Sequence, residues 1–98
     1  MTRFARENTR WIRLFDEYIL SHPQVLDSFP EDIHFVLLPE DDPELAYYNA
    51  QVANRNIEAN QTPVAVYVRT DQGKPEFRIE AVKDLSVLLI DGALIAGN

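Results

Sequence analysis

A strand, helix and strand in succession dominate the middle of the chain and constrain its fold more than any other feature. The apolar run at residues 33–38 has neither helical nor alternating periodicity, which is typical of a short strand. A helix is predicted over residues 43–60, with Asp42 as its N-cap and Pro43 at its first position. Residues 64–70, "VAVYVRT", are rich in β-branched side chains and predict a second strand. This order predicts a βαβ unit, with parallel strands joined by a right-handed crossover.

The N-terminal region predicts a further helix over residues 4–20. Its aromatic and isoleucine side chains share one arc, and arginines form the opposite stripe. Pro23 ends this helix, because the residue before a proline is pushed out of helical geometry. A short helical turn is expected around Val25 and Leu26 in the connector that follows.

The last third predicts strands rather than helix. "DQGKP" has the composition of a hairpin loop, and residues 76–82 alternate apolar and charged side chains, as expected of an antiparallel strand with one wet face. The end, "LSVLLIDGALIAGN", holds two apolar runs separated by Asp91-Gly92, a strong hairpin signal. A single apolar helix over residues 84–90 is the competing interpretation.

We therefore expect a two-layer α+β fold in the order α-β-α-β-β, followed by a C-terminal apolar hairpin. The fold contains one βαβ unit within a small mixed sheet. A chain of 98 residues suits a single domain over residues 1–98.

Composition excludes several classes of protein. The chain has no cysteine, which excludes disulfides, thiolate metal sites and cysteine nucleophiles. No apolar run approaches the roughly 20 residues needed to cross a bilayer. The N-terminus lacks the apolar core of a signal peptide. A cytoplasmic protein that does not bind membranes is expected.

The net charge of −7 is unevenly distributed along the chain. Residues 1–14 carry four arginines against one glutamate, a net of +3, and the remainder carries five basic and fifteen acidic residues, a net of −10. Strong acidity opposes direct binding of nucleic acid, because phosphate neutralisation supplies most of that affinity. The basic helix could instead pair with an acidic protein or with a second copy.

The acidic cluster in "LLPEDDPEL" is the strongest candidate for a ligand site. Glu40, Asp41 and Asp42 follow a predicted strand, and ligands of open α/β sheets bind beyond the carboxyl ends of parallel strands. Their oxygens could hold Mg²⁺ or Ca²⁺, although the spacing matches no calcium loop. The alternative is structural: Asp42 caps the helix, and Glu44 in its first turn offsets the helix dipole.

The sequence supports no catalytic centre. The histidines are His22 and His34, no serine lies in a nucleophile elbow, and the three glycines cannot form a nucleotide-binding loop. No catalytic residue, resident metal or cofactor is therefore predicted, and an enzyme is unsupported.

Asn49 is less expected, because it falls within the apolar arc of the second predicted helix. A buried asparagine needs hydrogen-bond partners. Asn49 either braces a backbone carbonyl of a neighbouring loop or lines a polar pocket with Tyr48 and His34. Asn60 is expected to cap the end of the same helix.

Two regions are candidates for a protein interface. One is the arginine stripe of the first helix, and the other is the almost chargeless C-terminal stretch, which either closes the core or covers a partner. The candidate interface residues are Arg6, Arg10, Arg13, Leu88, Leu89, Leu94 and Ile95.

Residues 4–68 resemble a family of short bacterial and archaeal proteins known only as a domain of unknown function. The resemblance lies in His22-Pro23 after an amphipathic helix, the "LPEDDPEL" segment at residues 38–45, and the early Asn49 of the next helix. It implies a single domain and supplies no activity or ligand.

Two hypotheses for function remain. The first is a non-enzymatic protein–protein interaction module, homodimeric or an antitoxin-like neutraliser of a basic partner. The alternative is a small-molecule or metal-binding protein that uses the acidic loop after the first strand.

Overall fold

The computed structural model describes residues 2–29 and 32–82. The chain divides into two compact units, Met1–Glu31 and Asp32–Asn98. The first contains two helices, and the second contains a sheet with one helix. The order of elements is the predicted one, and the fold class is α+β. The predicted C-terminal hairpin lies outside the described residues, and the single domain over residues 1–98 stays a prediction.

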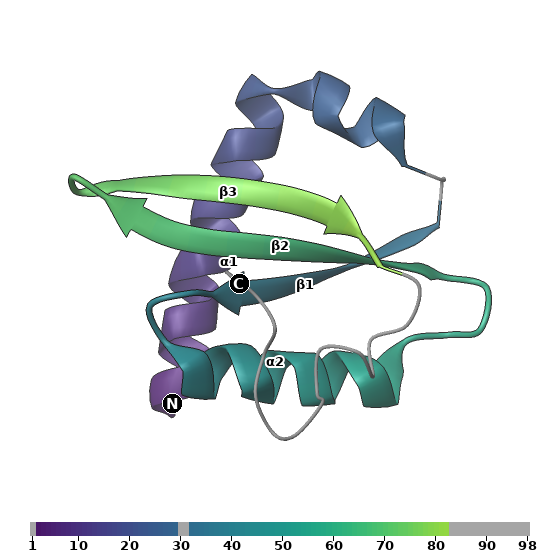
Figure 1. Ribbon diagram of the computed structural model, residues 1–98, viewed down its shortest axis with the longest axis horizontal. Coiled ribbons are helices and arrows are strands. Elements are labelled where there is room, and N and C mark those ends of the chain that lie inside the picture. Colours follow the sequence, from purple (N-terminus) through teal and green to yellow (C-terminus); the bar gives the residue numbers. More distant parts are fainter. Residues whose placement is uncertain (1, 30–31, 83–98) are drawn as a thin grey trace. The chain divides into compact units, whose positions relative to one another are not determined.

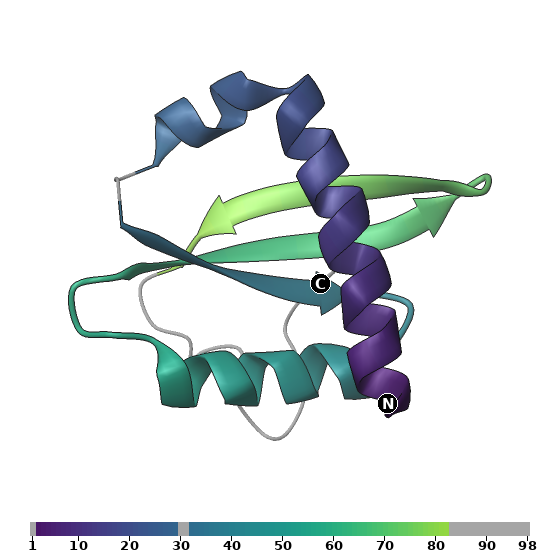
Figure 2. The same ribbon diagram turned by 180° about the vertical axis from the view of Figure 1, so that it is seen from behind.

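The first unit consists of the α-helix α1 (Arg3–Ser21) and the short 3₁₀ helix η1 (Pro23–Ser28). Thr2 is the N-cap of α1, and its Oγ1 accepts a hydrogen bond of 3.2 Å from the Ala5 N–H. Figure 2 shows η1 leaving the end of α1 at an angle. Both elements confirm the predicted helix and the predicted turn within the connector.

The second unit is built on a sheet of three strands in the order β1-β2-β3 (Figure 1). Strand β1 (Ile33–Pro39) runs parallel to β2 (Thr62–Asp71), and β3 (Lys74–Ala81) runs antiparallel to it. The predicted small mixed sheet is confirmed. Among the described strands β2 is the middle one, and its residues 63–68 are buried without interruption.

Backbone hydrogen bonds show which residues of each outer strand face β2. The Glu40 N–H donates to the Val68 carbonyl at 2.7 Å, and the Thr62 N–H donates to the Asp32 carbonyl at 2.9 Å. Backbone groups alternate in direction along a strand, so even-numbered residues of β1 point toward β2 and odd-numbered ones point away. On the other side the Val82 N–H donates to the Pro63 carbonyl at 3.0 Å, so odd-numbered residues of β3 point away from β2.

Helix α2 (Pro43–Asn56) forms the second layer of this unit. Its buried alanines, Ala46, Ala50 and Ala53, recur at helical spacing and lie against four sheet side chains: Val36, Leu38, Ala65 and Tyr67. Small side chains on the buried face let the helix approach the sheet closely. The helix and the two parallel strands are the predicted βαβ unit.

The end of α2 differs from the prediction. The helix stops at Asn56 rather than at residue 60, because Ile57 adopts extended backbone (φ −66°, ψ 137°) and packs beside the core cluster. A turn follows, in which the Glu58 N–H donates to Gln61 Oε1 at 3.0 Å. Asn60 is therefore not a helix cap; its Nδ2 donates to Asp32 Oδ2 at 3.0 Å.

The β2–β3 hairpin turns through Gln72 and Gly73, which both have positive φ, 52° and 78°. Two central residues with positive φ are what a type I′ turn requires, and this turn matches the right-handed twist of paired strands. The predicted hairpin loop is confirmed.

We expect Gly73→Ala to lower the free energy of unfolding by about 1 kcal/mol, because an L side chain is strained at φ +78°. A Cβ built at this position meets no atom within 4 Å, so the cost is one of backbone conformation alone. Urea unfolding measures it. Gln72→Gly, which relieves the neighbouring strained position, should change stability in the opposite direction; equal stability of Gly73→Ala and the parent chain would contradict the assignment.

Candidate functional site

The acidic segment after β1 sends its carboxylates to separate partners. Asp42 is the N-cap of α2, and its Oδ1 accepts from the Leu45 N–H at 3.3 Å. Asp41 Oδ2 accepts from the Thr70 N–H at 3.2 Å. Thr70 lies on β2 beyond the end of β1. Its N–H therefore bonds to the Asp41 carboxylate instead of to a backbone carbonyl of β1. The predicted capping by Asp42 is confirmed, with Glu44 in the first helical turn.

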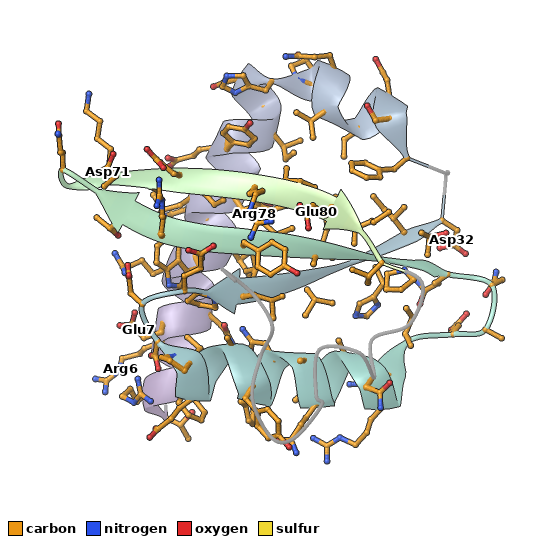
Figure 3. The ribbon with its side chains drawn as sticks, viewed as in Figure 1. Arg6, Glu7, Asp32, Asp71, Arg78 and Glu80 are labelled. Atoms are coloured by element: carbon orange, nitrogen blue, oxygen red, sulfur yellow. The ribbon has the colours of Figure 1, made fainter. Side chains whose placement is uncertain are left out.

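Glu40 takes part in a cluster centred on Arg78, which is labelled with its neighbour Glu80 in Figure 3. The Arg78 guanidinium lies over the Tyr67 ring, with Cζ 4.2 Å from the ring centroid. Its two terminal nitrogens lie 2.7 Å from Glu80 Oε1 and 3.7 Å from Glu40 Oε1. One arginine thus connects side chains on β2 and β3 with the carboxylate that follows β1.

The surroundings of Tyr67 raise the pKa of its phenol. Burial is the largest cause, the Glu80 carboxylate adds to it, and the Arg78 guanidinium acts in the opposite direction. The phenol is held in its neutral form beside the guanidinium. It is therefore a structural platform for Arg78 and not a proton donor poised near neutral pH.

A second pair lies farther along the hairpin. Arg69 Nε donates to Glu76 Oε2 at 2.9 Å, between directly opposed residues of β2 and β3. This hydrogen bond lowers the pKa of the Glu76 carboxyl below its usual range, with a smaller contribution from Asp71. Both side chains are about half exposed, so the pair belongs to the surface.

These contacts bear on the metal hypothesis. Within residues 2–29 and 32–82, no group of three or more histidine or carboxylate side chains is placed to hold a metal ion. Glu40, Asp41 and Asp42 diverge toward a guanidinium, a strand N–H and a helix N–H. The structure therefore places them at the junction of β1 and α2 without bringing them together around a common centre.

Asn49 braces the outer edge of β1. Its Nδ2 donates to the Leu37 carbonyl at 2.9 Å. Leu37 is odd-numbered, so its carbonyl points away from β2, and none of the described strands lies on that side to pair with it. This contact is the first of the two roles predicted for Asn49, but the carbonyl belongs to a strand and not to a loop. Tyr48 on the same helix is 41% exposed, and His34 is half-buried on β1.

The predicted interface arginines are exposed on α1. Arg10 lies 3.5 Å from Glu7 and 4.8 Å from the centroid of the Trp11 ring. Arg6 and Glu7 are labelled on the same helix in Figure 3. The other predicted interface residues, Leu88, Leu89, Leu94 and Ile95, lie outside the described residues.

Arg78 and Tyr67 were not predicted as a cluster. The alternation of residues 76–82 placed Arg78 on the wet face of a strand, but its partners depend on the strand register. Had the register been known, Tyr67 opposite Arg78 would have been the signal.

The fold and these contacts define a small α+β protein. The carboxylates between β1 and α2, which we call the acidic junction, contact backbone N–H groups and Arg78 of the same chain. Residues 3–82 match a family of unknown function, DUF5647, and the chain belongs to this family. The match extends the predicted resemblance through β3. No curated protein and no solved structure matches the chain. No helix among the described residues is both long and apolar enough to cross a membrane.

We expect Asn49→Ala to lower the free energy of unfolding by about 1–2 kcal/mol, because it removes the donor to a partly buried carbonyl. Urea unfolding measures the change. Asn54→Ala is a matched control, since Asn54 is exposed on the same helix and gains the same helix propensity, about 0.5 kcal/mol. Equal unfolding free energies for the two variants would show that the brace does not stabilise the fold.

We expect Arg69→Gln to raise the pKa of Glu76 toward its ordinary value, because the lowered pKa depends first on the Arg69 hydrogen bond. A group whose folded pKa is lowered stabilises the fold above its unfolded pKa, and that stabilisation is lost as the pH falls through the folded pKa. Carboxyl-carbon NMR titration measures the change. Arg55→Gln, at an exposed arginine on α2, should leave the Glu76 titration unchanged.

Proposed function

We propose that this chain is a non-enzymatic protein–protein interaction module that works as a homodimer. The observation that carries the proposal is a charge complementarity within one chain. The arginines of α1, Arg6, Arg10 and Arg13, are exposed, while residues 15–98 carry a net charge of −10. A second copy therefore offers an acidic surface to the basic stripe, and a twofold arrangement makes such a contact twice.

The contacts of Glu40, Asp41 and Asp42 also favour an interaction module over a ligand-binding protein. A ligand site needs polar groups that converge on one point, whereas Glu40, Asp41 and Asp42 each hold a different part of the fold. A ligand at these residues would compete with a helix cap, a strand-end hydrogen bond and an ion pair that the fold already makes. The small-molecule or metal-binding hypothesis is correspondingly weaker.

Size adds a physical reason for association. A chain of about 100 residues buries only roughly two-thirds of the surface that its unfolded form exposes. Burying further surface against a second copy stabilises the folded state by mass action.

Sedimentation velocity of the full chain over a wide range of protein concentrations tests the proposal. We expect a concentration-dependent dimer that weakens with added salt, because exposed charges are screened over about 8–10 Å at physiological ionic strength. The combined variant Arg6→Gln, Arg10→Gln and Arg13→Gln should dissociate at lower salt than the parent chain.

Arg55→Gln is the control, because it removes one exposed arginine from α2 and leaves the α1 stripe intact. A monomer at every concentration would contradict the proposed function.

A further inference from the structure

Strand β3 lies at one edge of the described sheet. It pairs with β2 on one side, and on the other side the described strands offer no neighbour (Figure 1). The backbone groups of Ile79 and Ala81 point away from β2, as the Val82 to Pro63 hydrogen bond requires. The Pro75 carbonyl also points away from β2, but proline has no N–H that could donate a hydrogen bond there. An edge of this kind is a template for another strand.

The charges on β3 alternate in sign along one face. The order along the strand is positive, negative, positive, negative, from Lys74 through Glu76 and Arg78 to Glu80. All four residues are exposed. Their backbone groups point toward β2, so they would occupy the non-hydrogen-bonded positions of any strand added at the outer edge. Side chains at those positions lie closest together across a strand pair.

We propose that β3 is a second self-association surface of this protein, in addition to the α1 stripe, and that it pairs antiparallel with β3 of a second copy about a twofold axis beside residue 77. In this register Lys74 lies opposite Glu80 of the second copy, and Glu76 lies opposite its Arg78. The twofold axis repeats both pairs, so every charged position on this face of β3 meets the opposite sign. The Ile79 N–H donates to the Pro75 carbonyl of the second copy, and the two sheets become one.

The alternating charges also select against other pairings. Sliding the second copy by two residues places Arg78 opposite Arg78 and Glu76 opposite Glu80. Parallel pairing in register places every charge opposite its own kind. Like charges directly opposite one another destabilise a strand pair, so the pattern specifies both direction and register.

Charges and a proline on an edge strand can also serve to prevent pairing altogether. If the charges only prevent pairing, reversing the charge of one β3 residue should leave the dimer dissociation constant unchanged. If β3 pairs as proposed, one reversal should weaken the dimer and a second, opposite reversal should restore it. The inference rests on the homodimer of the proposed function and adds a contact through β3 to the contact proposed for the α1 stripe.

Lys74→Glu and Glu80→Lys test the pairing, because both residues are exposed. Glu80→Lys also removes the ion pair between Arg78 and Glu80 of the same chain, whereas Lys74→Glu leaves that ion pair in place. Each variant alone turns two opposite-charge pairs of the dimer into like-charge pairs. We expect each to raise the dimer dissociation constant by about tenfold in sedimentation experiments on the full chain. Thermal unfolding at low concentration verifies that each variant is folded.

The two substitutions in one chain exchange the charges and should return the dissociation constant to within about threefold of the parent value. An equimolar mixture of the two single variants should form heterodimers in preference to either homodimer. Glu58→Lys is the matched control, since it makes the same change of charge at an exposed turn after α2 and should leave dimerisation unaltered.

The possible outcomes separate this inference from the proposed function. A dimer that Lys74→Glu and Glu80→Lys leave unchanged, or that the double variant does not restore, would overturn pairing through β3 and retain the homodimer. A monomeric parent chain would overturn both.

Discussion

The backbone hydrogen bonds between β1 and β2 hold the second unit in register, and an aspartate secures each end of this pairing. At the start of β1 the Asp32 carbonyl accepts from Thr62, and its carboxylate accepts from Asn60 and Gln61 in the segment that leads into β2. At the other end Asp41 accepts from Thr70 after β1 has finished. Parallel strands need a long crossover, so these two residues fix where the returning chain meets β1.

The carboxylates at the β1–α2 junction also stabilise the fold. Asp42 caps the N-terminus of α2, Asp41 extends the pairing of β1 with β2, and Glu40 forms an ion pair with Arg78 of β3. Clustered acids after a strand are often taken as a ligand site, because their charges repel unless something compensates them. Here the compensation comes from backbone N–H groups and Arg78.

Several features were predictable because they depend on neighbouring residues alone. Asp42 and Pro43 define a helix start through local geometry, and "DQGKP" defines a tight hairpin whose Gly73 accepts positive φ. The end of α2 was not predictable in this way. Its last residues have helical propensity, yet Ile57 leaves the helix to pack beside the core, so tertiary packing overrides local preference.

The sequence by itself determined the order of elements, the mixed sheet and the need of Asn49 for a hydrogen-bond partner, because periodicity, caps and burial of polar groups are local or additive properties. Only the tertiary structure decided that Asn49 serves the Leu37 carbonyl, that Arg78 lies on Tyr67, and that β3 lies at the edge of the described sheet. Those facts follow from register and strand order. Residues distant in the chain become neighbours only when one particular set of strands has paired. The alternation of side chains along a single strand does not determine which strands pair or in what register.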